Sequence, residues 1–102
     1  MKALMLNTAE AVARVQDIPI PTLQANELLV KVHAVALNNV DAIYVAKPIA
    51  LQPERVVGSD FAGEVIAVSE ELMNSEDPRC KVGARVAGFS QGGIQFTLIR
   101  LY

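Results

Sequence analysis

Short runs of alternating apolar and polar residues dominate the chain and predict a fold built mainly from strands. The clearest run follows Asn26, where one face carries Leu28, Val30, Val32 and Ala34 and the other carries Glu27, Lys31 and His33. This two-residue period is typical of a half-buried strand. We expect further short strands at Lys2–Leu6, Ala11–Val15, Gly63–Ser69 and Ala84–Ala87, the last ended by Gly88. The first two of these strands are expected to form a hairpin.

Proline-containing and polar segments separate these strands. The prolines of Ile18–Pro21 cannot donate hydrogen bonds to a sheet, so this segment is expected at a sheet edge or in a connector. Gln52–Glu54 is expected to be a polar loop that leads to Val56 and Gly58. Met73–Arg79 is rich in turn residues and is expected to be a surface loop.

The pattern changes to helical spacing at Asn38. Asn38 can cap a helix, Asp41 suits the first turn electrostatically, and Val40, Ile43 and Tyr44 follow at helical intervals. We therefore expect a short helix over Asn38–Val45. The helix should end at Lys47-Pro48, because a residue before proline is disfavoured in the α region. Several short strands with one brief helix favour a small, partly open β-barrel over a parallel βαβ sheet.

Composition narrows the class of protein. The 102 residues suit one domain, and 52% hydrophobic and 20% charged residues favour a packed core over disorder. The nine Lys and Arg residues are scattered and the formal net charge is -2, which argues against nucleic acid as a partner. No apolar run approaches the roughly 18 residues needed to cross a bilayer. We expect a protein of the cytoplasm without a membrane partner.

The residue types present exclude most catalytic motifs. A zinc site needs three or four ligands of suitable type, and the chain has one Cys and one His, so no metal site is expected. The six glycines do not form the G-x-G-x-x-G pattern of a dinucleotide loop. The only His, His33, lies on the polar face of its strand and is expected to be solvated or structurally bonded. Composition and spacing thus give a β-rich domain without a mechanism.

The order and wording of four segments add a family resemblance. They are Asn26–Val32, similar to an "E-V-L-V-K-V" strand; Leu37–Asp41, similar to an "x-N-P-x-D" turn; Val57–Val65, similar to "G-x-D-F-A-G-x-V"; and Lys81–Phe89, similar to "K-V-G-D-R-V-A-G-F". Together they resemble the N-terminal, alcohol dehydrogenase-like domain of the medium-chain dehydrogenase/reductase family. The wording is closest to its quinone oxidoreductase and enoyl reductase branches. Ala84 departs from the family's usual Asp, and the residues after Gly93 do not continue as "G-x-F-A-E-Y".

The resemblance implies a GroES-like barrel over residues 1–93, with residues 94–102 as a tail foreign to the family. In the family a Rossmann domain that binds NADPH normally follows the barrel, and we expect the chain to be truncated before it. Zinc-dependent members carry Cys at the position of Asn38 and His at that of Ser59, so the resemblance favours the zinc-independent branch. NADPH is then expected for the full-length parent and no cofactor for this chain alone.

The resemblance also points to candidate site residues. It places Asn38 near the nicotinamide, where its amide can hydrogen-bond the cofactor or the substrate; a plain helix cap is the alternative. Asp41 and Asp60 match positions beside the substrate cleft, although structural roles are favoured for both. Tyr44 is a further catalytic candidate, against which a core-facing ring is the safer expectation.

The function expected from the resemblance is NADPH-dependent reduction of an enone, enoyl or quinone-type small molecule by the parent protein, with this chain inactive alone. The alternative is a stand-alone GroES-like module that binds or self-assembles without catalysis. A third interpretation is a mispredicted or truncated gene product. We also expect self-association through an exposed domain face. The uncharged tail Ile94–Ile99 should add an edge strand or fray.

Overall fold

The computed structural model describes residues 1–7, 9–47, 54–90 and 99–101. Within these ranges the chain is mainly β, with one α-helix. The elements in order are β1 (Lys2–Asn7), β2 (Val12–Asp17), β3 (Leu28–Ala36), α1 (Asn39–Ala46), β4 (Glu54–Val56), β5 (Asp60–Val68), the 3-10 turns η1 (Glu70–Leu72) and η2 (Pro78–Cys80), β6 (Arg85–Phe89) and β7 (Ile99–Leu101). No helix in the described ranges is both long and apolar enough to cross a membrane.

The first sheet has the strand order β2-β1-β4. The predicted hairpin is confirmed, since β1 and β2 pair antiparallel from Lys2 opposite Asp17 to Asn7 opposite Val12. Asn7 closes the turn because its side-chain oxygen accepts hydrogen bonds from two backbone N–H groups that follow it, at 3.0 and 3.2 Å. The prediction of a loop through Glu54 is wrong at that residue, since Glu54 begins β4. Backbone pairing with β1 outweighs the polar character of that segment.

The second sheet has the order β6-β5-β3-β7 and contains most of the core. β3 and β5 pair antiparallel over their full lengths. The fully or nearly buried apolar side chains of this sheet are Leu28, Val30, Phe61 and Val65. The predicted inward face of β3 is therefore confirmed at its first positions. The segment Ile99–Leu101 forms an edge strand parallel to β3. Of the segment Ile94–Ile99, from which an edge strand was expected, only Ile99 lies in β7, and residues 94–98 lie outside the described residues.

The prediction that Ala34 shares the inward face of β3 is wrong. Val32 pairs with Gly63 but Ala34 pairs with Ala62, so His33 is an extra residue in a β-bulge. Because side chains alternate across a strand, one inserted residue moves every later side chain to the opposite face. Ala34 consequently points outward with Ala62, and His33 is exposed.

Two boundaries differ from those expected. β6 continues through Gly88 to Phe89, because glycine leaves room for the ring of Phe61: a Cβ at Gly88 would lie 3.0 Å from Phe61 Cζ. The surface loop expected over Met73–Arg79 ends in the 3-10 turn η2. The helix α1 matches its prediction, with Asn38 as N-cap and Lys47 as C-cap.

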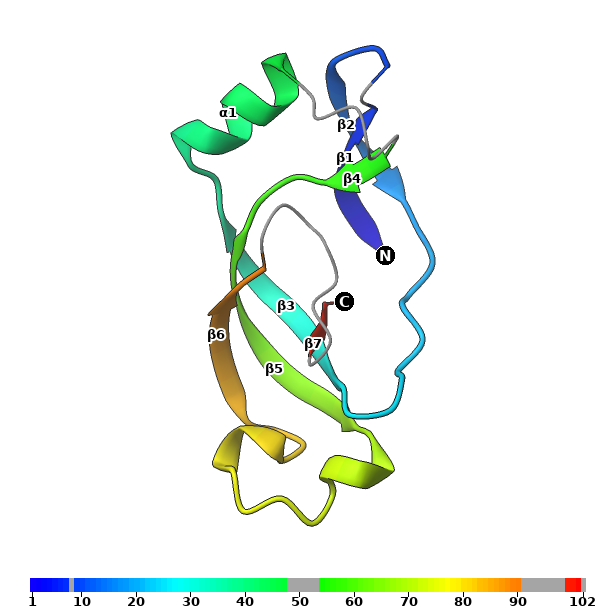
Figure 1. The fold of residues 1–102 in the computed structure, drawn as a ribbon, viewed down its shortest axis with the longest axis vertical. Coiled ribbons are helices and arrows are strands. Elements are labelled where there is room, and N and C mark those ends of the chain that lie inside the picture. Colours follow the sequence, from blue (N-terminus) through cyan, green and yellow to red (C-terminus); the bar gives the residue numbers. More distant parts are fainter. Residues whose placement is uncertain (8, 48–53, 91–98, 102) are drawn as a thin grey trace.

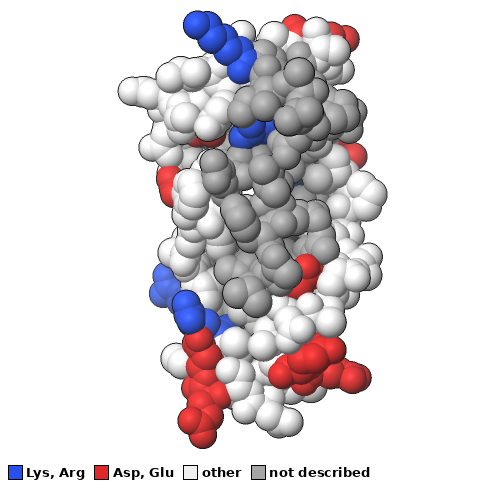
Figure 2. All heavy atoms as spheres, in the orientation of Figure 1, with Lys and Arg blue, Asp and Glu red and all other residues white. Residues whose placement is uncertain are grey.

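The two sheets lie one above the other in Figure 1, and the long curved strands β3 and β5 lead from the lower sheet toward α1. The molecule is elongated, with extents of 44 × 22 × 21 Å. The expected β-rich, partly open barrel with a short helix is confirmed. Figure 2 shows acidic side chains gathered at the end that carries η1 and η2, whereas the visible surface over α1 is mostly uncharged.

Candidate functional site

The candidate site lies where β3 passes into α1. Asn38 leaves the strand with extended backbone angles (φ -121, ψ 165) and caps the helix. The carboxylate of Asp41, one turn into the helix, accepts a hydrogen bond from the backbone N–H of Asn38 at 2.7 Å. This is the arm of a capping box that reaches back to the cap residue. It fixes the direction in which the Asn38 side chain leaves the backbone.

Asp41 also joins the helix to the segment before β5. Its second oxygen accepts a hydrogen bond from the backbone N–H of Gly58 at 3.2 Å, and the residue is only 5% exposed. Gly58 has φ +102, a conformation that side chains rarely adopt. The buried carboxylate thus satisfies two backbone donors that would otherwise lack partners. The structure therefore buries Asp41 beneath the exposed surface of the site, where it links the backbone of Asn38 to that of Gly58.

The amide of Asn38 is held by Asp60. Its Nδ2 donates a hydrogen bond to Asp60 Oδ2 at 2.9 Å across 22 residues of sequence. Asp60 is the first residue of β5 and pairs with Ala36 on one side and Phe89 on the other. A rigid part of the sheet therefore orients an exposed side-chain amide. An amide nitrogen carries two hydrogens, and Asp60 takes one, which leaves the second N–H for a ligand.

The turn that precedes Asp60 is hydrogen-bonded to the end of β6. The backbone N–H of Ser90, just after β6, donates to the carbonyl of Ser59 at 2.6 Å. Ser59 itself is 7% exposed. Below it, the buried ring of Phe61 packs against Gly88. These contacts hold the start of β5, and with it the carboxylate of Asp60, in one position.

Tyr44 stands apart from this arrangement. Its half-buried ring lies under the guanidinium of Arg55 in β4, 4.6 Å from the ring centroid, a cation–π contact. The structure therefore joins Asn38, Asp41 and Asp60 into one hydrogen-bonded set, and Tyr44 is not hydrogen-bonded to these three residues. Sequence reasoning missed the N–H of Gly58 and the side chain of Arg55. The only sequence signal for Gly58 was its place beside Ser59-Asp60, and Arg55 gave none.

The described residues contain no group of three or more His, Cys, Asp or Glu side chains placed to hold a metal ion. What the site offers is an oriented amide donor next to a carboxylate. Such a pair can bind and orient a carbonyl or carboxamide oxygen. It contains no cysteine or histidine that could serve as a nucleophile or proton shuttle.

Comparison with known proteins gives consistent matches. The family model described as "Alcohol dehydrogenase GroES-like domain" matches residues 24–95. The chain is 38% identical over 91 residues to the trans-enoyl reductase caaB of Aspergillus niger, covering 88% of this chain and 23% of that protein. It is 45% identical over 74 residues to the trans-enoyl reductase opdC of Penicillium oxalicum, covering 72% and 19%. It is also 36% identical over 91 residues to an L-threonine 3-dehydrogenase of Symbiobacterium thermophilum, covering 85% and 24%.

A solved structure matches as well. The mycobacterial protein Rv1454c, described as a complex with NADPH, superposes with a TM-score of 0.69 and 29% sequence identity, over 91% of this chain and 29% of that one. The chain spans between 19% and 24% of the length of the curated relatives named above.

Proposed function

Because this chain belongs to the medium-chain dehydrogenase/reductase family through its alcohol dehydrogenase GroES-like domain, we propose that it acts in a zinc-independent, NADPH-dependent oxidoreductase. The proposed reaction is reduction of an enone, enoyl or quinone-type acceptor. The observation that carries the proposal is the hydrogen bond from Asn38 Nδ2 to Asp60. It presents an oriented amide donor on the exposed surface of a domain whose relatives include reductases.

The proposed acceptor class rests on the relatives. The proteins of Aspergillus niger and Penicillium oxalicum are trans-enoyl reductases by name, and they match 88% and 72% of this chain. Reduction of a polarised carbon–carbon double bond places negative charge on the acceptor oxygen. An N–H donor aimed at that oxygen stabilises the charge as it develops. The second N–H of Asn38 suits this role.

The residues present also fit the nicotinamide end of NADPH, which the matching mycobacterial structure contains. When bound, this cofactor supplies the hydride. The chain's own contribution is binding and orientation: Asn38 donates to a carboxamide or acceptor oxygen, Asp60 holds the Asn38 amide, and Asp41 holds the Asn38 backbone. Asn38 in the proposed site is thus both the catalytic and the cofactor-binding candidate. Asp41 and Asp60 act as positioning residues.

Two residue identities support a reaction without zinc. Asn38 and Ser59 occupy the positions at which the zinc-dependent branch carries Cys and His ligands. Here the Asn38 amide nitrogen is engaged with Asp60, and Ser59 is buried in the turn below. The nitrogen lone pair of an amide is delocalised into its carbonyl group, so it is not available to a metal ion. This set suits hydrogen-bond donation better than metal ligation.

The test is a chimera in which this chain replaces the matching segment of the Aspergillus niger trans-enoyl reductase. We expect the chimera to oxidise NADPH when given an enone. Asn38→Ala should lower kcat/KM about tenfold to a hundredfold, because the acceptor loses its oriented donor. Asp60→Ala should act in the same direction through Asn38. Asp17→Asn, an exposed carboxylate on β2, is the matched control and should leave the rate unchanged.

Two outcomes would contradict the proposal. One is stoichiometric zinc in the folded, active chimera together with loss of activity on chelation. The other is an active chimera whose rate is unaffected by Asn38→Ala, which would reduce Asn38 to a helix cap.

A further inference from the structure

A hollow of about 530 Å³ lies on the sheet formed by β3, β5 and β6 and belongs to no part of the site described above. Its lining includes Ala34, Ala62 and Ala87, with His33, Glu64 and Arg85 beside them. The hollow is open to solvent on its outer side, so a small molecule bound there keeps one side exposed.

The floor of the hollow is one row of alanines. Ala34 pairs with Ala62, and Ala62 pairs with Ala87, so the three side chains lie side by side across three strands. The row spans about 10 Å, twice the usual distance between neighbouring strands. Alanine is depleted in strands because it has little side chain to pack on a sheet surface. Three alanines in register leave a shallow apolar depression where larger side chains would fill it.

Charged side chains form the next row of the same face. Lys31 pairs with Glu64, and Glu64 pairs with Arg85, two residues along each of β5 and β6 from the alanines. The ion pairs within the described ranges are Lys2 with Asp17, Arg14 with Glu10 and Arg79 with Asp77. Arg85 and Lys31 therefore have no ion-pair partner among the described residues. Two cations around one carboxylate give this row a net positive charge.

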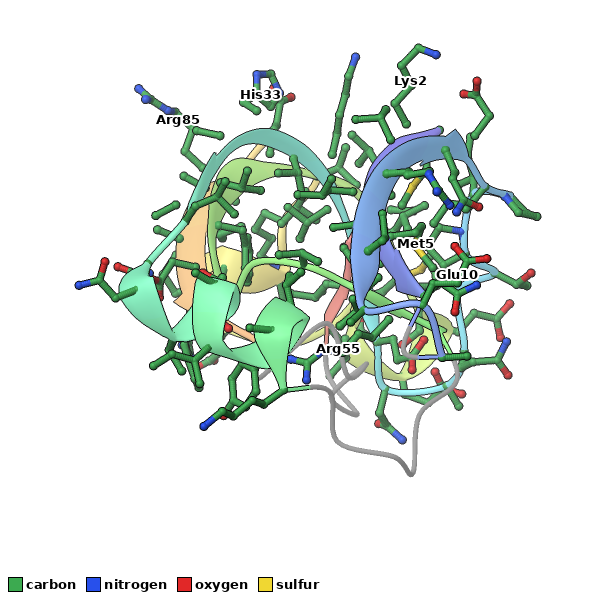
Figure 3. The ribbon with its side chains drawn as sticks, turned by 90° about the horizontal axis from the view of Figure 1, so that it is seen from above. Lys2, Met5, Glu10, His33, Arg55 and Arg85 are labelled. Carbon is green, nitrogen blue, oxygen red and sulfur yellow. The ribbon has the colours of Figure 1, made fainter. Side chains whose placement is uncertain are left out.

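The β-bulge in β3 adds His33 to this rim. His33 is the residue inserted between the pairs Val32–Gly63 and Ala34–Ala62. Figure 3 shows His33 and Arg85 projecting from the same outer side of the sheet, away from the interior. Bulges commonly redirect a side chain beside a binding site. Here the bulge places a ring with an N–H donor beside the alanine row on β3, on the other side of β5 from Arg85.

We propose that this hollow binds a small amphiphilic carboxylate. The guanidinium of Arg85 matches a carboxylate in a two-point hydrogen bond, and His33 supplies a further N–H donor. The short hydrocarbon chain lies along the alanine floor, where its burial removes apolar surface from water. Glu64 opposes the bound anion and limits its affinity. The proposal goes beyond the reduction proposed above and needs neither NADPH nor a reducible group.

The experiment is a titration of the isotopically labelled 102-residue chain with sodium hexanoate, followed by two-dimensional NMR at constant ionic strength. We expect saturable shifts at the amides of Ala34, Ala62, Ala87 and Arg85. Arg85→Gln should weaken binding about tenfold or more, since a charge-assisted pair is lost. Glu64→Gln should tighten binding about threefold, because it removes the opposing charge. Ala87→Leu should abolish binding by filling the exposed floor while the spectrum stays folded.

Arg14→Gln, which removes one positive charge from β2, is the matched control and should leave affinity unchanged. 1-Hexanol should bind at least about tenfold more weakly than hexanoate, because it lacks the anionic group. The proposal would be overturned by shifts that do not saturate or that spread over the whole surface. It would also be overturned if Arg14→Gln and Arg85→Gln weakened the binding of hexanoate equally. Unchanged binding in Ala87→Leu would overturn it as well. None of these outcomes bears on the proposed reduction, which involves the Asn38 end.

Discussion

Asp41 shows how one buried carboxylate can determine the geometry of the candidate site. Its two oxygens accept hydrogen bonds from Asn38 N–H and Gly58 N–H at 2.7 and 3.2 Å. Replacing it by Asn keeps the shape but turns one acceptor into a donor that faces another donor. We expect Asp41→Asn to lower the free energy of unfolding by about 1–3 kcal/mol, the cost of a buried group left unpaired.

Urea unfolding at pH 7 measures this change. Asp17→Asn is the control, because its ion pair with Lys2 has side chains 75% and 71% exposed and should be worth less than about 1 kcal/mol. Equal free energies of unfolding for Asp41→Asn and the unsubstituted chain would show that the two hydrogen bonds of Asp41 do not stabilise the fold.

The residues of the site were predictable from the sequence to different degrees. Asn38 as a cap and Asp41 in the first turn follow from local patterns alone. Asp60 was selected only by family resemblance, and its bond to Asn38 could not be predicted, since it joins positions 22 residues apart through the pairing of Ala36 with Asp60. Arg55 over Tyr44 depends on where β4 docks, which no local pattern in that segment indicates.

At the scale of elements, Gly63 sets the distance between β3 and β5. A Cβ at this position would lie 2.3 Å from the carbonyl oxygen of Lys31, which belongs to the opposing strand. Backbone cannot yield as a flexible side chain can. We expect Gly63→Ala to cost about 3 kcal/mol or more, the upper range for overpacking. Calorimetry combined with amide exchange at Val30 and Val32 measures the loss.

Gly83→Ala makes a useful comparison, since a Cβ there meets nothing within 4 Å and the strain comes only from φ +88. It should destabilise by about 1–3 kcal/mol without faster exchange in β3. Unchanged exchange at Val30 in a stable Gly63→Ala variant would contradict the close approach of the two strands.

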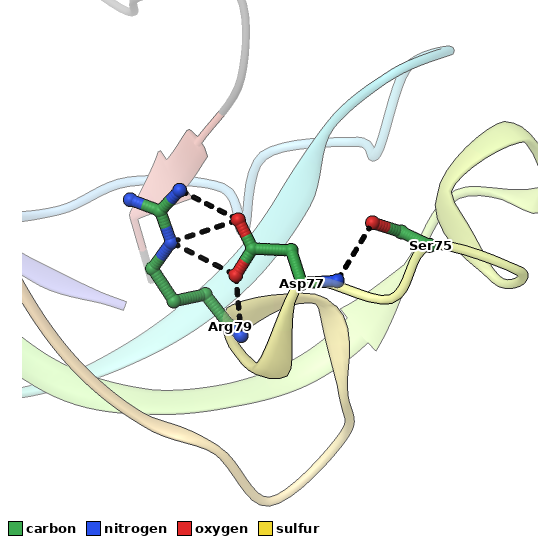
Figure 4. A network of polar contacts seen from close by, with 3 residues as sticks. All are labelled: Ser75, Asp77 and Arg79. Carbon is green, nitrogen blue, oxygen red and sulfur yellow. Dashed lines mark hydrogen bonds and ion pairs between the residues drawn. The ribbon is translucent and has the colours of Figure 1, made fainter.

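The turn η2 depends on a local ion pair. Asp77 accepts hydrogen bonds from the backbone N–H and the side chain of Arg79, which Figure 4 shows together with Ser75. The side-chain bond from Arg79 and then the backbone bond lower the pKa of Asp77 from 3.8 to about 2. A lowered pKa in the folded chain means that this contribution is present above pH 3.8 and is lost as the pH falls through about 2.

We therefore expect carbon-detected NMR titration of the Asp77 carboxyl to give a midpoint of about 2. Arg79→Gln should raise the midpoint toward 3.8, because the charged donor is lost. High salt should raise it partly, since the Arg79 side chain is 75% exposed and its charge is screened. The same midpoint in both chains would show that Arg79 does not hold this carboxylate.

Most strands could be predicted from alternation, because burying one face imposes a two-residue period. The bulge at His33 could not, since a polar residue at that position fits the outward face with or without an insertion. Its effect is large: it turns Ala34 outward and creates the alanine row. Likewise, Gly88 indicated a strand end locally, but the ring of Phe61 requires a glycine inside β6 at that place.

At the scale of the whole molecule, large apolar side chains of β6, α1 and the segment between β3 and α1 are exposed. Leu37 is 62% exposed and Ile43 57%, and Phe89, opposite Asp60 in the sheet, is 65% exposed. We expect the 102-residue chain to self-associate reversibly through this surface as concentration rises. Sedimentation velocity measures it. The double variant Leu37→Lys, Ile43→Lys should restore the monomer. Val15→Lys is the control and should not, because Val15 lies on β2 and is itself 67% exposed in the unsubstituted chain.

The native mass of the associated species distinguishes a stand-alone, self-assembling module from a domain of a larger enzyme. A closed ring of defined size would favour a stand-alone module that assembles itself. A monomer–dimer equilibrium abolished by the double variant would agree with a domain face that is normally covered.

The exposed surface around Asn38 and Asp60 also determines how tightly these 102 residues can bind NADPH. The pyrophosphate of a dinucleotide is usually held by a glycine-rich loop at a helix N-terminus, and the six glycines here do not form that pattern. Asn38 and Asp60 supply one oriented amide on an exposed surface, which is too few contacts for tight binding. We expect a dissociation constant for NADPH weaker than about 1 mM, which corresponds to about 4 kcal/mol of binding free energy. Calorimetric titration of the double variant Leu37→Lys, Ile43→Lys, kept monomeric, measures it without interference from association. Micromolar binding that Asn38→Ala abolishes would show instead that this domain can hold the cofactor by itself.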